Sequence, residues 1–104
     1  MINIYKFDMD INFLLESVKI MNKKTQTDDE ANTVFVYIIS TELEELKEYK
    51  RKNTIISFEN DLELFINVID KLLLYYEDSE EYERCDCLYN RKKLCELIMK
   101  DIQI

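Results

Sequence analysis

Residues 58–77 read FENDLELFINVIDKLLLYYE. At about 100° per residue, the large apolar side chains of this stretch gather on one face of an α-helix. Ser57 stands directly before the stretch, and serine is a favoured N-cap residue. The sequence therefore predicts an amphipathic helix over residues 58–77, with a buried face made of Leu62, Phe65, Ile69, Leu72, Leu73 and Tyr76.

A second apolar stripe follows on the C-terminal side. Ser79 is a candidate N-cap there, with acidic residues in the next turn and the basic run 91–93 further along, which matches the helix dipole. The sequence predicts a helix that starts after Ser79. Its narrower apolar stripe consists of Cys85, Leu88, Cys95, Met99 and Ile102.

On the N-terminal side, apolar residues recur at steps of three and four between Ile4 and Met21. This spacing indicates a helix over residues 3–23, and the cations Lys23 and Lys24 suit its negative C-terminal end. The expected buried stripe consists of Ile4, Phe7, Ile11, Leu14, Leu15, Val18 and Met21.

The middle of the chain allows two interpretations. Thr27 and Glu30 have the spacing of a capping box, from which one long helix would run to the basic segment 50–53. The run 33–39, however, is continuously β-branched or aromatic and is also typical of a buried strand. In that case a second capping box at Thr41 would start a shorter helix.

The absence of all Gly and Pro from the 104 residues disfavours hairpins, so helix ends would depend on asparagine. We expect one all-α domain over residues 1–104, a compact antiparallel bundle of three to four helices. The alternative is an α+β fold with a small sheet that uses 33–39. The asparagines that could end helices are Asn22, Asn32, Asn53 and Asn60.

The residues needed for common catalysis are missing. The sequence has no His, no Gly-rich phosphate loop and no Gly-x-Ser-x-Gly elbow, so we expect no enzymatic activity and no cofactor. In a helix, Cys85 and Cys87 would point about 200° apart and could not share a metal ion. We therefore expect no metal site, with Cys85 and Cys95 in the core and Cys87 exposed.

The chain contains no run of about eighteen apolar residues and does not open like a signal peptide. The odd number of cysteines, three, also does not form a secreted disulfide framework. These features predict a soluble cytoplasmic protein that does not bind membranes. The acidic net charge of −8 opposes direct binding to nucleic acid.

The distribution of charge points to a binding surface. Residues 53–90 contain ten acids against two bases, while the remainder of the chain is balanced. In the helix 58–77, four carboxylates share one side, and further acids follow in the next segment, where Tyr82 adds an aromatic ring suited to interfaces. The predicted partner-binding residues are Glu59, Glu63, Asp70, Glu77, Asp78, Glu80, Glu81, Tyr82, Glu83 and Asp86.

Such a surface suits a small inhibitor that occupies the basic cleft of another protein, for example the nucleic-acid-binding groove of a nuclease or other effector. In size and charge the whole chain resembles phage-encoded anti-defence proteins, such as anti-CRISPRs, and bacterial toxin-immunity proteins. The alternative is a helical regulatory or structural module that self-associates as a homodimer. Val36 and Tyr37 favour that alternative, because a long helix through them would be apolar nearly all round.

Overall fold

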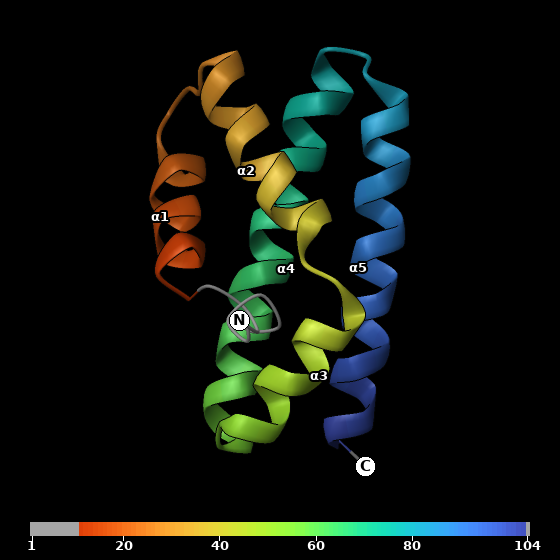
Figure 1. Ribbon diagram of the computed structural model, residues 1–104. Helices are drawn as coiled ribbons and strands as arrows, with labels where there is room; N and C mark the ends of the chain where they lie inside the picture. Colours follow the sequence, from red (N-terminus) through yellow and green to blue (C-terminus); the bar gives the residue numbers. More distant parts are fainter. Residues whose placement is uncertain (1–10, 104) are drawn as a thin grey trace, which may run out of the picture.

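The computed structural model describes residues 11–103, and these form helices with no strand between them (Figure 1). The all-α prediction is confirmed, and the small sheet through 33–39 is wrong because that run lies inside a helix. The predicted start of the first helix, residues 3–10, lies outside the described residues. The helices are α1 (Ile11–Asn22), α2 (Asp28–Ser40), α3 (Leu43–Lys52), α4 (Ile55–Asp78) and α5 (Tyr82–Gln103).

Helix α4 forms the centre of the bundle and packs against all four other helices (Figure 1). All six residues of its predicted face are buried, and Phe58 and Val68 are buried with them. The helix begins three residues earlier than predicted, because Thr54 rather than Ser57 is the N-cap. The Thr54 hydroxyl accepts a hydrogen bond from the backbone N–H of Ser57 at 3.1 Å.

The described part of the chain has one helix more than the expected three to four, because the segment after Thr27 divides into α2 and α3. The predicted capping box of Thr27 and Glu30 is present at the start of α2. At Thr41 the backbone is extended, and α2 ends there. The Thr41 hydroxyl donates a hydrogen bond to the Tyr37 carbonyl and does not cap α3. The Arg91 guanidinium of α5 donates to the Ile39 and Thr41 carbonyls at 2.8 and 2.7 Å. A side chain from another helix therefore satisfies the backbone that the break leaves open.

The turn between α4 and α5 corrects a second prediction. Ser79 is the C-cap of α4 and not the N-cap of the next helix. The backbone N–H of Glu80 donates to the Glu77 carbonyl, and that of Glu81 donates to the Tyr76 carbonyl, which is the hydrogen-bond pattern of a Schellman motif. Glu80 occupies the left-handed position of this motif with φ of 59°. Glycine is the residue that usually fills this position, since other L-residues have a steric cost there.

We expect Glu80→Gly to raise the free energy of unfolding by about 0.5–1 kcal/mol, because glycine removes the left-handed strain at this position. Glu80→Ala is the matched control, since it removes the same charge but keeps a Cβ atom. Urea denaturation of the two variants isolates the backbone contribution. Equal stability of Glu80→Gly and Glu80→Ala would contradict the assigned turn.

The other helices confirm most of the predicted core. Leu14 and Met21 of α1 are buried and Ile11 and Val18 are half-buried, but Leu15 is 48% exposed, because α1 packs against α2 and α4 with Ser17 in the buried position instead. In α5, Cys85, Leu88 and Cys95 of the predicted stripe are buried, Met99 is half-buried, and Ile98 joins them in the core, while the side chain of Ile102 lies outside the described residues. Asn22 and Asn53 stand at helix ends as expected. Asn32 and Asn60 do not, since they lie within α2 and α4.

The cysteines have the predicted distribution, with Cys85 and Cys95 buried and Cys87 exposed. Burial raises the pKa of the Cys95 thiol to about 12 and also raises that of Cys85. The folded state therefore holds these protons more tightly than the unfolded chain does. This contribution to the free energy of unfolding is lost as the pH rises above the thiol pKa of the unfolded chain, which is about 8.5.

At pH 8, we expect iodoacetamide to alkylate Cys87 in the native protein and to leave Cys85 and Cys95 unmodified, because the reagent can reach only the exposed thiol. All three cysteines should react in denaturant. Mass spectrometry of the digested protein identifies the modified positions. Native labelling of Cys95 at a rate near that of Cys87 would show that the end of α5 is not packed as described.

Candidate acidic binding surface

Exposed carboxylates gather at the end of the bundle where α2 begins and α4 turns into α5, at the top of Figure 1. A hollow of about 400 Å³ lies between these segments and is lined by residues of α2, α4 and α5. We call this region the acidic end. It consists of Asp28, Asp29, Asp78, Glu80, Glu81 and Glu83, all of which are exposed.

Two contacts fix the acidic end by joining segments about fifty residues apart. The Tyr75 hydroxyl of α4 donates a hydrogen bond to the Asp28 carboxylate. The pKa of Tyr75 is raised to about 12, mainly by this hydrogen bond to Asp28. The phenol therefore stays a donor at all physiological pH values. On α5, the Arg84 guanidinium donates to the Asn32 side-chain oxygen of α2 at 2.9 Å.

Arg84 also forms the floor of the hollow. Its guanidinium lies 4.5 Å from the Phe35 ring centroid and 5.1 Å from that of Tyr76, and it donates to the Tyr76 hydroxyl at 3.1 Å. An ion pair with Glu81 at 3.6 Å neutralises part of its charge. Three carboxylates line the hollow around this guanidinium, so the hollow keeps a negative excess.

The charge pattern at the end of α4 opposes stability. The C-terminal end of a helix carries partial negative charge, which favours cations there. The last turn of α4 contains no base, and the chain continues with Asp78, Glu80 and Glu81. Glu80 and Glu81, however, also stand directly before α5, where carboxylates are favourable, so only the acids within the last turn of α4 oppose a helix dipole.

The sequence predicted that four carboxylates on one side of α4 are open to a partner, and the structure shows that some of them are already paired. The four are Glu59, Glu63, Asp70 and Glu77. They share one side of the helix, and that side borders α5. Asp70 forms an ion pair with Lys92 of α5 at 2.7 Å, and this hydrogen bond is the main cause that raises the pKa of Lys92. Glu77 accepts a hydrogen bond from the Tyr89 hydroxyl at 2.8 Å, which raises the pKa of Tyr89. Both carboxylates therefore already hold the two helices together.

The remaining predicted residues fall in separate places. Glu59 and Glu63 lie in the first half of α4, far along the helix from the acidic end, and Glu59 is half-buried. Tyr82 and Asp86 are exposed on the side of α5 that faces away from the core. The structure therefore brings together Asp78, Glu80, Glu81 and Glu83, but not all ten predicted residues at one surface.

Asp28 and Asp29 are the members of the acidic end that sequence reasoning missed. Their position in the first turn of α2 explains them fully as helix-stabilising charges. Only the packing of α2 against α4 and α5 shows that they also face the α4–α5 turn. No local pattern in the sequence could have indicated this.

A basic border limits the acidic end on the α1 side. Lys23, Lys24 and Lys71 line a neighbouring hollow together with Asp78. Lys23 pairs with Glu30, and this hydrogen bond is the main cause that lowers the pKa of the Glu30 carboxyl. The surface is therefore acidic over the start of α2 and the α4–α5 turn, with a change of sign beside α1.

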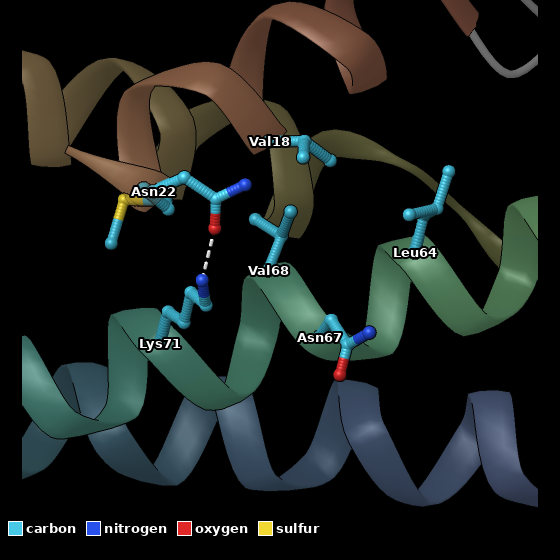
Figure 2. Close-up of a pocket in the computed structure, with 7 residues that line it drawn as sticks. Val18, Asn22, Leu64, Asn67, Val68 and Lys71 are labelled. Atoms are coloured by element: carbon cyan, nitrogen blue, oxygen red, sulfur yellow. Dashed lines mark hydrogen bonds between the residues drawn. The ribbon is translucent and has the colours of Figure 1, made fainter.

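A second, apolar groove lies between α1 and α4 (Figure 2). Val18 and Val68 point toward one another across it, and a hydrogen bond from Lys71 to the Asn22 side-chain oxygen bridges one end. Its volume is about 230 Å³. This is small for a ligand site, since such sites typically measure about 300–1,000 Å³.

Within the described part of the chain, no group of three or more Cys, Asp or Glu side chains has the arrangement of a metal site. Over the same residues, every helix is either too short or too polar to cross a bilayer. Comparison with protein-family models, with curated proteins and with solved structures finds no match for this chain.

Proposed function

We propose that this chain works by binding another protein, and that its acidic end occupies a basic cleft on that partner. The partner would be an effector whose cleft binds nucleic acid, such as a nuclease, and the chain would act as its inhibitor. The single observation that supports this most is the convergence of exposed carboxylates from α2 and from the α4–α5 turn on one end of the bundle.

The chemistry of the acidic end fits such a partner. Clefts that bind nucleic acid are lined with Lys and Arg, and carboxylates held in a fixed array compete with phosphates for these side chains. The contacts of Tyr75 with Asp28 and of Arg84 with Glu81 hold two of these carboxylates in place before binding, which lowers the entropic cost of association. Opposite fields would also speed the encounter of the two proteins.

The test begins with affinity capture of partners from the native or nearest cultivable host, at low and then at moderate salt, followed by mass spectrometry. The captured protein is then loaded with a labelled oligonucleotide, and the chain is added. We expect stoichiometric release of the oligonucleotide, which is measured by the fluorescence anisotropy of its label. A partner that binds the chain and its nucleic acid together would overturn the inhibitor proposal.

The second candidate function is a helical module that self-associates. Exposed residues of α5, rather than Val36 and Tyr37 of α2, now favour it. Tyr37 is half-buried and packs against Phe13 in a tilted contact and against Phe65 edge-on, at 4.7 and 6.1 Å between ring centroids. Tyr37 is therefore part of the core and not a surface for self-association. Val36 remains 48% exposed, but larger apolar side chains are exposed on α5, where Tyr82 is 62% and Leu97 is 61% exposed.

A further inference from the structure

Helix α5 lies at the edge of the bundle, with one long side uncovered (Figure 1). Its buried residues lie on the side packed against α4 and α2. On the opposite side, at about 100° per residue, the exposed residues form one stripe along the helix. We call this stripe the outer face of α5. It consists of Tyr82, Asp86, Tyr89, Asn90, Lys93, Leu97 and Lys100.

The charge of α5 differs from that of the remaining chain. From residue 82 to 103 the sequence has five bases and four acids, whereas the whole chain has a net charge of −8. In α4, by contrast, six acids accompany a single base. Contact between two copies of an acidic protein is least opposed by charge where the surface is near neutral. The outer face of α5 is such a surface.

Two copies of this face complement one another when their α5 helices run antiparallel. Asp86 and Lys93 are equidistant from a point between Tyr89 and Asn90, and so are Tyr82 and Leu97. A two-fold axis through that point places Asp86 opposite Lys93 of a second copy, and Tyr82 opposite its Leu97. Asp86 and Lys93 then each meet the opposite charge, and the two most exposed apolar side chains of the face cover one another.

We propose that two copies of this chain pair through the outer face of α5, antiparallel and about this two-fold axis. Beside Leu97, a hollow of about 490 Å³ lined by Lys93, Glu96 and Lys100 gives room for the Tyr82 ring of the second copy. The flanking ammonium groups also suit the face of an aromatic ring.

The antiparallel direction follows from the acidic end. A parallel pair would bring the acidic ends of both copies together, with strong repulsion. In the antiparallel pair the length of α5 separates them by roughly 30 Å, which is several times the screening length of about 8–10 Å at physiological salt. The two acidic ends then lie at opposite ends of the pair.

The expected affinity is low, because one helix pair buries less than the roughly 1,200 Å² of small standard interfaces. We expect a dissociation constant of about 10–500 µM. Sedimentation velocity with full-length protein, from about 1 µM to about 1 mM, measures the equilibrium. A protein that remains monomeric over this whole range would overturn the proposal.

Charge exchange tests the axis itself. Asp86→Lys and Lys93→Asp should each weaken dimerisation at least about tenfold, because each places like charges opposite one another. An equimolar mixture of these two variants should regain dimerisation, since each copy then offers the charge that the other needs. Only the proposed register pairs position 86 of one copy with position 93 of the other. Mixtures that fail to dimerise would overturn it.

Apolar variants provide the matched control. Leu97→Asp should abolish dimerisation up to about 1 mM, whereas Leu74→Asp should not, although Leu74 is equally exposed on α4. Thermal unfolding by circular dichroism verifies that each variant remains folded, as expected for surface changes that cost about 0.5 kcal/mol or less. Loss of the dimer in Val36→Asp with no loss in Leu97→Asp would transfer the contact to α2 and overturn the proposal.

Discussion

Phe65→Ala should lower the free energy of unfolding by about 3–5 kcal/mol, which is a large part of the 5–15 kcal/mol typical of a domain. Phe65 is fully buried at the middle of α4, the helix that contacts all the others, and its ring packs edge-on against Tyr37. Truncation leaves a cavity that a close-packed core fills only in part. Urea denaturation followed by circular dichroism measures the loss.

Leu74→Ala is the control for Phe65→Ala, because Leu74 lies on the same helix but is 66% exposed. Its loss should not exceed about 0.5 kcal/mol. Leu72→Ala, at another fully buried position of α4, should cost about 2–5 kcal/mol. If the exposed and buried positions gave similar losses, the assigned buried face of α4 would be wrong.

Local periodicity predicted most of the helices, because each helix must bury one side. The apolar face of α4 could be assigned residue by residue, since a 24-residue helix repeats its pattern often enough to fix the face. The capping box at Thr27 was also predictable, since both of its hydrogen bonds join residues three apart in the chain.

Two of the helix boundaries that differed from prediction, the break after Ser40 and the turn at Ser79, depend on distant or competing contacts. A shorter helix starting near Thr41 was one of the two interpretations of the sequence, but the break after Ser40 is held by Arg91, some fifty residues away, and no window around residue 40 contains that contact. Serine is favoured by type at an N-cap, so the pattern at Ser79 predicted a helix start. The outcome depended on Glu80 accepting a left-handed conformation, which is not expected of glutamate.

The acidic surface was predictable as a composition but not as a shape. The sequence located the negative charge in residues 53–90, and four of the predicted acids do meet at the α4–α5 turn. It could not show that Asp70 and Glu77 have partners on α5, or that Asp28 and Asp29 join the acidic end. Both findings depend on which helices are neighbours, and a charge pattern within one helix contains no such information.

Reversing charge at Asp78, Glu80 and Glu83 together, each to lysine, should weaken binding to the captured partner by about a hundredfold or more. All three are exposed members of the acidic end with no carboxylate bond to another helix among the described residues, so the fold should persist. Most of the loss should appear as slower association, because opposite fields act on the encounter. Surface plasmon resonance at several salt concentrations measures this, and the salt dependence should flatten.

The control reverses Glu16, Glu42 and Glu44 to lysine, which changes the net charge by the same amount at exposed positions of α1 and the start of α3. This variant should bind the partner within about threefold of the wild type, because charges more than a screening length from the contact act weakly. If both triple variants lost affinity equally, total charge alone would govern binding. If neither lost affinity, the carboxylates of the acidic end would only keep that end of the bundle hydrated, and the partner would have to contact another surface.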